Sequence, residues 1–217
     1  MGKEYYWWSS VKKVLILAEG DSEEKFIKEI LSPHFKDKHI YLIPKNLRGV
    51  STYKKMKQEI HTLLKDSSAT IVTTMIDLYR IPSDFPNKAQ ATTLAYEEKI
   101  KNLEESFFKD IEKSNFLPYL QLHEFESLLF SDVSQFEKIP TVGQSKVKQL
   151  HKILNSLKPE EINELPNTAP AKRITNIVGD IYRKPLHGII IAKAIGLVKM
   201  REECPHFNQW ITSIESI

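Results

Sequence analysis

Cysteine is nearly absent from this sequence of 217 residues, in which Cys204 is the only one. A single thiol forms no internal disulfide bond and supplies no cysteine zinc site, so both kinds of scaffold are excluded. The sequence also lacks an apolar run of membrane-spanning length, and its start does not look like a signal peptide. These absences favour a cytoplasmic protein with no membrane partner. A hydrophobic content of 41% is enough for a buried core.

The two common glycine-rich nucleotide-binding loops are missing as well. Neither Gly-x-x-x-x-Gly-Lys-Ser/Thr nor Gly-x-Gly-x-x-Gly occurs in the sequence. Both loops cradle phosphates with backbone N–H groups, so a nucleotide site of either type is disfavoured. No convincing Ser-His-Asp or Cys-His set for nucleophilic catalysis is present either.

Charge is unevenly distributed, although the net charge of +3 is small. From Pro170 to Arg201 there are seven basic residues and a single acidic one, Asp180, and seven minus one gives +6. Such a stretch suits a phosphate backbone, and a solvated protein face explains it about equally well. Its bases are Lys172, Arg173, Arg183, Lys184, Lys193, Lys199 and Arg201.

Strand patterns alternate with helix patterns over the first 130 residues. Short apolar runs predict strands at 12–18, 39–44, 69–76 and 116–122. Amphipathic stretches predict helices between them, at 53–65 and 90–112 among others. This alternation predicts an α/β fold with a mostly parallel sheet flanked by helices. Because the pattern after Pro140 is only helical, we expect an α/β domain at 1–135 and a helical C-terminal extension, 136–217, packed on it.

Three of the predicted strands lead into carboxylates. The first ends at Glu19, the third ends at Asp77, and the fourth leads into Glu124 and Glu126. The carboxyl ends of parallel strands share one edge of the sheet, where open α/β sheets bind their ligands. Several carboxylates at that edge repel one another unless protons or a cation join them, and a hard divalent metal is the simplest solution.

The acids and the nearby histidine also have simpler interpretations. Glu23 follows a glycine turn with Asp21 as a candidate N-cap, and acids are favoured at helix N-termini by the helix dipole. Asp77 pairs with Arg80 as readily as with a metal. His123 lies in His-Glu-Phe-Glu rather than His-Glu-x-x-His, so a partly buried histidine with satisfied hydrogen bonds is favoured over a zinc ligand.

Some of the bases are candidates for holding phosphate. Lys184, in the segment Tyr-Arg-Lys-Pro, is suited to neutralising a phosphate or the charge that develops on a leaving group. Lys172 and Arg173 lie near a predicted helix start, which is a common place for an anion. Taken singly, each base is explained better as an ordinary surface residue.

Five segments carry a resemblance to a known family: 18–24, 75–82, 84–86, 121–130 and 204–207. A strand that ends in Glu-Gly, followed by Ser-Glu-Glu and a helix, and a second strand that ends in Asp resemble the Toprim fold of topoisomerases, primases and the overcoming-lysogenization-defect (OLD) nucleases. The full set is similar to a bacterial Toprim-like family of unknown function. Its members are often encoded beside AAA or ABC-type ATPases in defence loci.

The resemblance implies an endonuclease of antiphage defence that depends on Mg²⁺ or Mn²⁺ and works with a partner ATPase. Its substrate is then a nucleic acid, DNA or RNA. The matching positions imply that Glu19 and Asp77 are catalytic residues and metal ligands and that Glu23 is a further ligand. Lys184 is the candidate for the catalytic lysine of OLD-type nucleases.

One position departs from the Toprim pattern, because Tyr79 occupies the place of the second aspartate in Asp-x-Asp. Glu124 or Glu126 is then expected to supply the missing metal-binding oxygen. Nucleic-acid binding is expected from Lys172, Arg173, Arg183 and Lys184. The departure keeps an alternative open, a catalytically inactive nucleic-acid-binding or regulatory subunit of an ATPase complex. The oligomeric state stays open, with a homo-oligomer as one option.

Overall fold

A parallel sheet forms the centre of the molecule. The computed structural model describes residues 11–49, 52–91, 93–154, 157–162 and 168–217. The strands are β1 (Lys12–Ala18), β2 (Ile40–Asn46), β3 (Ile71–Asp77), β4 (Phe116–Leu117) and β5 (Leu120–Gln121). They form one sheet in the order β2-β1-β3-β4, with β5 also paired to β3, and every pairing is parallel. The predicted α/β fold with a mostly parallel sheet is therefore confirmed.

The central strands are apolar on both faces because helices cover both sides of the sheet. Along β1, Val14 and Ile16 pack into one buried cluster, whereas Leu15 and Leu17 pack into a second cluster on the opposite face. This explains why the strand reads as a continuous apolar run in the sequence rather than as an alternating one.

The predicted fourth strand, 116–122, is interrupted. Pro118 separates β4 from β5, and β3 compensates for the break with a side chain. The Thr74 hydroxyl accepts a hydrogen bond from the Tyr119 N–H at 3.1 Å and donates one to the Tyr119 carbonyl at 2.7 Å. The prediction of one unbroken strand was therefore wrong, since proline has no N–H to give to the ladder.

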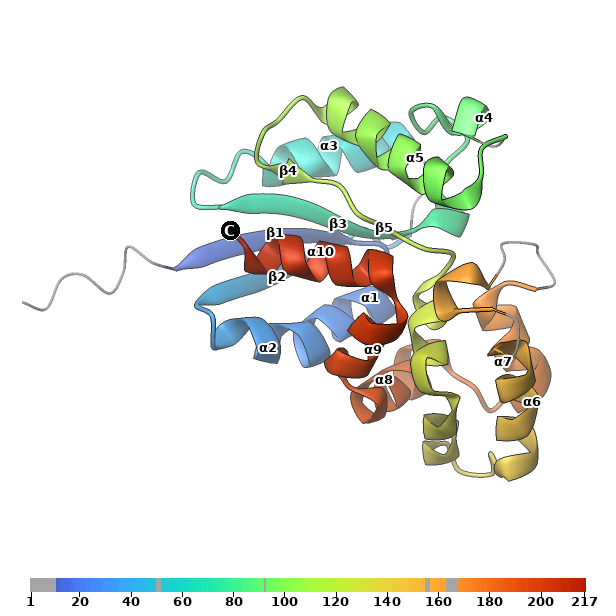
Figure 1. Cartoon of the computed structure of the whole chain (residues 1–217). Helices are drawn as coiled ribbons and strands as arrows, with labels where there is room; N and C mark the ends of the chain where they lie inside the picture. Colours follow the sequence, from blue (N-terminus) through green and yellow to red (C-terminus); the bar gives the residue numbers. More distant parts are fainter. Residues whose placement is uncertain (1–10, 50–51, 92, 155–156, 163–167) are drawn as a thin grey trace, which may run out of the picture.

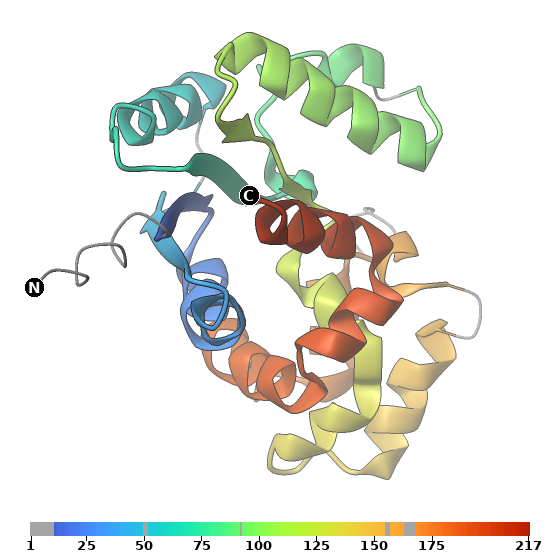
Figure 2. The ribbon, with the colours of Figure 1, turned by 60° about the vertical axis from the view of Figure 1, so that its left-hand side comes forward.

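The helices form two layers (Figure 1). On one face lie α3 and α5, and on the other lie α1, α2 and the C-terminal helices, as the turned view in Figure 2 also shows. The helical segments are α1 (Asp21–Phe26), η2 (Ile27–Leu31), α2 (Ser32–Lys36), α3 (Tyr53–Leu63), η3 (Leu78–Arg80), α4 (Lys88–Ala91), α5 (Tyr96–Ile111), η4 (Phe125–Lys138), α6 (Gln144–Leu154), η5 (Pro159–Glu161), α7 (Pro170–Val178), η6 (Lys184–Gly188), α8 (Ile189–Ile195), α9 (Leu197–Glu203) and α10 (Pro205–Glu215).

The C-terminal helices share the core of the sheet. The Trp210 indole N–H on α10 donates a hydrogen bond of 2.9 Å to the Thr73 hydroxyl on β3, and the Trp210 ring stacks on Tyr119 with centroids 4.3 Å apart. One apolar cluster accordingly joins residues from both sides of position 135. The predicted division into 1–135 and 136–217 stays a prediction. Among the described helices, none has the length and apolar character needed to cross a membrane.

Candidate functional site

The three predicted carboxylate-bearing strand ends meet at one edge of the sheet. Glu19 follows β1, and its Oε2 accepts a hydrogen bond of 3.0 Å from the N–H of Asp77, the last residue of β3. The Asp77 Oδ1 in turn accepts one of 2.9 Å from the Phe125 N–H, just beyond β5. The acids thus tie the ends of three strands together, as expected from a parallel sheet.

Glu23 reaches the same edge from the first turn of α1. The preceding Gly20 is extended, and it makes no side-chain cap. The expected N-cap, Asp21, is instead the first helical residue, and its Oδ1 accepts a hydrogen bond of 2.8 Å from the Asn46 amide. The capping prediction for Asp21 was therefore wrong. The Glu23 side chain is only 4% exposed and lies among the other acids.

Lys184 lies in the middle of these acids. Its Nζ is 2.9 Å from Glu126 Oε2, 3.6 Å from Asp77 Oδ2 and 3.8 Å from Glu23 Oε1. The lysine comes from the start of η6, more than a hundred residues from Asp77 in the sequence. We call the set Glu19, Glu23, Asp77, Glu126 and Lys184 the acidic cluster.

Burial dominates the electrostatics of the acidic cluster. It raises the pKa of Glu19 to about 7, and it raises the pKa values of Asp77 and Glu126 above their usual range. Burial alone would lower the pKa of Lys184, but the charges of Asp77, Glu126 and Glu23 outweigh it and raise that pKa. One ammonium therefore faces four carboxyl groups, and the cluster is short of positive charge.

Several polar atoms in the cluster lack hydrogen-bond partners. Among the described residues, no donor serves Glu23 Oε1 or Glu126 Oε1, and the nearby Tyr182 hydroxyl has no partner either. Glu126 Oε2 has no hydrogen-bond partner among these residues either, and the ammonium of Lys184 lies 2.9 Å from it as an ion pair. Buried polar atoms are normally paired, so these unpaired oxygens call for an explanation.

The donor set suits a hard divalent cation, because all four acids offer carboxylate oxygens. In the part of the chain that the structure describes, however, no three side chains of Asp, Glu, His or Cys are arranged to hold one metal ion. Three of the acids face the ammonium of Lys184 instead. The chemistry of the donors fits a metal, whereas their arrangement is centred on the ammonium of Lys184.

The two candidate glutamates after β5, Glu124 and Glu126, have different partners. Glu126, in η4, is fully buried in the acidic cluster, whereas the Glu124 Oε2 accepts a hydrogen bond of 3.0 Å from the Ala171 N–H in the first turn of α7. The backbone is extended at Glu124 and helical from Phe125 on, so the two side chains take different directions. Glu126 is therefore the acid that joins Asp77, and Glu124 holds a helix N-terminus.

His123 lies apart from the acids, as the sequence predicted. It is 2% exposed, its Nε2 is 2.9 Å from the Glu160 carbonyl, and its ring stacks on Tyr96. The interpretation as a buried histidine with hydrogen bonds is confirmed. Arg80 lies over the Tyr79 ring at 5.9 Å, and Tyr79 is 37% exposed, so this ring does not replace an acid.

Of the four predicted nucleic-acid-binding bases, only Lys184 joins the acidic cluster. Lys172 and Arg183 are exposed, and the Arg173 Nε donates a hydrogen bond to the Thr168 carbonyl. Sequence reasoning missed Tyr182, whose buried hydroxyl has its pKa raised by burial and by the charge of Glu126. The position of Tyr182, two residues before Lys184, was the sequence signal that could have placed it near the site.

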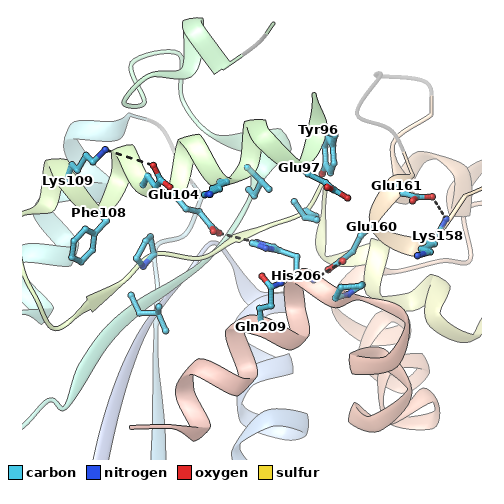
Figure 3. A pocket seen from close by; sticks show the side chains of 17 residues that line it. Tyr96, Glu97, Glu104, Phe108, Lys109, Lys158, Glu160, Glu161, His206 and Gln209 are labelled. Carbon is cyan, nitrogen blue, oxygen red and sulfur yellow. Dashed lines mark hydrogen bonds and ion pairs between the residues drawn. The ribbon is translucent and has the colours of Figure 1, made fainter. Parts of the chain in front are cut away.

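A separate groove with a volume of about 780 Å³ lies between α5 and α10 (Figure 3). Two of the acids that line it, Glu104 and Glu160, are paired. Glu104 Oε1 accepts a hydrogen bond of 2.8 Å from the Leu120 N–H and lies 3.1 Å from His206 Nε2. The two oxygens of Glu160 accept hydrogen bonds from the N–H groups of His206 and Phe207 at the start of α10.

Comparisons with known proteins give one family and a set of solved structures. The model of the family described as "Domain of unknown function (DUF4276)" matches residues 18–215. The C-terminal region of the Burkholderia pseudomallei OLD protein is 16% identical, with 94% of this chain and 97% of that chain covered and a TM-score of 0.48. The C-terminal region of the Xanthomonas campestris pv. campestris OLD protein is 12% identical, with 94% and 98% covered and a TM-score of 0.43. No curated protein matches the chain.

Proposed function

This chain belongs to the DUF4276 family, and we propose that it is a nuclease that hydrolyses phosphodiester bonds with Mg²⁺ or Mn²⁺. The observation that carries the proposal is the acidic cluster at the carboxyl edge of the sheet. Three buried carboxyl groups, the half-buried Glu19 and one lysine meet there, and three of the carboxylate oxygens have no hydrogen-bond donor among the described residues. Buried polar atoms in a purely structural cluster are normally paired.

Glu19, Glu23, Asp77 and Glu126 would hold the cation in this proposal. When bound, a divalent ion supplies Lewis-acid polarisation of the scissile phosphate and a more acidic water. Glu126 would supply the carboxylate that Tyr79 does not. Glu124 remains only a predicted ligand, since its Oε2 accepts the Ala171 N–H.

Lys184 supplies the positive side-chain charge of the site. Its pKa is raised by the charges of Asp77, Glu126 and Glu23, so the ammonium is charged at any physiological pH. A lysine in this position neutralises the negative charge that grows on a phosphate in the transition state. The negative charge of the acids opposes the approach of an anionic substrate, and a bound cation would offset it.

The proposal extends to the cellular role that the sequence resemblance implies. The chain would act in the cytoplasm, in antiphage defence, with an AAA or ABC-type ATPase as partner. DNA or RNA would approach along the basic stretch 170–201, which carries the exposed Lys172 and Arg183 and leads directly to Lys184. Phosphate contacts by such bases give affinity that falls with salt.

The test is cleavage by the purified protein. Single- and double-stranded DNA and tRNA are incubated with Mg²⁺, with Mn²⁺ or with EDTA, in the absence and presence of an ATPase encoded beside the gene. Cleavage that EDTA abolishes supports the nuclease. Cleavage that continues in EDTA contradicts the metal.

A second candidate function rests on Tyr79. An exposed tyrosine stands where the Toprim pattern has its second aspartate, which favours an inactive nucleic-acid-binding or regulatory subunit. Binding without cleavage, unchanged by metal and by the ATPase, supports this alternative.

A further inference from the structure

Lys184 is arranged as a cation among ligands. Its Nζ lies within 4 Å of one oxygen each of Glu23, Asp77 and Glu126, which come from α1, β3 and η4. The ion pair with Glu126 is the shortest at 2.9 Å, and the distances of 3.6 and 3.8 Å to Asp77 and Glu23 are too long for hydrogen bonds. The ammonium therefore attracts three carboxylates by charge, and Glu126 Oε2 still lacks a hydrogen-bond partner among the described residues.

The acids and the lysine differ in how firmly they are held. The side chains of Asp77 and Glu126 are 3% and 0% exposed, and Asp77 also accepts a backbone N–H. The Lys184 side chain is 33% exposed, on a flexible four-carbon stem at the first residue of η6. The carboxylates are fixed, and the ammonium has a route to solvent.

The lysine only partly meets the need of the acids. An ammonium has three protons to donate, yet Glu23 Oε1 and both carboxylate oxygens of Glu126 remain without hydrogen-bond donors among the residues described. A divalent cation brings twice the charge and accepts several oxygens at once. Because both cations attract the same oxygens, they compete for the same place.

We propose that Lys184 is a resident counter-ion, which holds Glu23, Asp77 and Glu126 together in the metal-free protein and is displaced toward solvent when a divalent cation binds. This inference rests on the proposed function. Displacement places the ammonium at the mouth of the cluster, where the phosphate of a nucleic acid can pair with it. Lys184 thus weakens the binding of metal alone and couples it to the binding of phosphate, since each ligand favours the displaced position.

The first experiment measures Mn²⁺ affinity without nucleic acid, by titration calorimetry at pH 8, and the melting temperature in EDTA. The variant is Lys184→Met, which keeps an unbranched side chain one atom shorter and removes its charge. The control is Lys193→Met, because Lys193 forms a 2.6 Å ion pair with Glu29 away from the cluster. We expect Lys184→Met to bind Mn²⁺ at least about tenfold more tightly and to melt at a lower temperature in EDTA, because the acids have lost their counter-ion. Lys193→Met should match the wild type in Mn²⁺ affinity.

The second experiment uses the wild-type protein, so it stands even where Lys184→Met does not fold. Reductive methylation is followed at each lysine by mass spectrometry, with EDTA and with Mn²⁺. We expect Mn²⁺ to raise the labelling of Lys184 several-fold and to leave that of Lys193 unchanged, because the displaced ammonium is accessible.

Two negative results have different meanings. Mn²⁺ binding with equal affinity in wild type and Lys184→Met, and with unchanged labelling of Lys184, overturns the counter-ion role and leaves the metal site intact. If the wild type and both variants fail to bind Mn²⁺, the metal dependence in the proposed function is overturned, and the displacement of Lys184 with it.

Discussion

Acidic side chains gather in two regions of this protein, and the two regions differ in how many hydrogen-bond donors the acids have. In the groove between α5 and α10, Glu104 and Glu160 accept backbone N–H groups, and Glu104 also pairs with His206. In the acidic cluster, one lysine serves four carboxyl groups, and Glu23 and Glu126 each have an oxygen without a donor among the described residues.

The difference separates acids that stabilise the fold from acids that, in our proposal, bind a cation. A buried carboxylate with two backbone donors contributes to stability, whereas one without donors costs desolvation energy that folding does not recover. In the groove, Glu160 and Glu104 bind the first turn of α10 and so fix where this helix starts. The cluster keeps charge that a cation can use, so function is the better explanation of its cost.

The largest expected effect is on cleavage. Asp77→Asn should lower the rate of metal-dependent cleavage by about 10³-fold, or about 4 kcal/mol, because it removes the central carboxylate charge. The fold should persist, since the amide oxygen can still accept the Phe125 N–H. Glu104→Gln in the groove is the matched control and should cleave at the wild-type rate. Wild-type cleavage by Asp77→Asn would show that Asp77 is not a ligand.

The next effect is on stability and should arise in the groove. Glu160→Ala leaves the N–H groups of His206 and Phe207 without acceptors, so the free energy of unfolding should fall by about 3 kcal/mol. Urea denaturation measures it. The neighbouring exposed Glu161 provides the control, and Glu161→Ala should cost roughly 0.5 kcal/mol. Equal losses from the two variants would remove the distinction drawn for the groove.

The third effect is that of added metal on stability, which should depend on the acidic cluster and not on the groove. Mn²⁺ at 100 times its dissociation constant should raise the free energy of unfolding by about 2.7 kcal/mol, because it binds only the folded chain. The gain should disappear in Asp77→Asn, persist in Glu104→Gln, and reverse when EDTA is added. A gain that survives in Asp77→Asn would place the ion elsewhere.

The smallest effect concerns pH. Burial alone would lower the pKa of His206, but its hydrogen bond to Glu104 and the charges of Glu104 and Glu160 raise it. The pair therefore stabilises the fold fully below about pH 6.5, the ordinary pKa of histidine, and loses this contribution as pH rises through the raised pKa. We expect a difference of about 1 kcal/mol between wild type and His206→Gln at pH 6 that shrinks by pH 9. A difference that stays constant across this range would mean that the charge of His206 has no part in it.

The strand patterns and their endings were sufficient to predict where Glu19 and Asp77 lie. Period and composition give strand positions, and parallel strands share an edge, so carboxylates that follow them meet. The break at Pro118 was visible in the sequence, but the Thr74 hydroxyl that bridges it was not, because side-chain compensation depends on a neighbouring strand. The helix start at Asp21 was missed because Gly20 can serve as an N-cap without a side chain.

The sequence by itself determined the parallel sheet and the gathering of acids at its edge, because both follow from local periodicity and from the shared direction of parallel strands. Only the tertiary structure decided between Glu124 and Glu126, since the backbone changes from extended to helical between them and sends one to α7 and the other to the cluster. It also placed Lys184 among the acids. No pattern within a segment encodes a contact between η6 and β3, which exists only because the C-terminal helices pack on the same sheet.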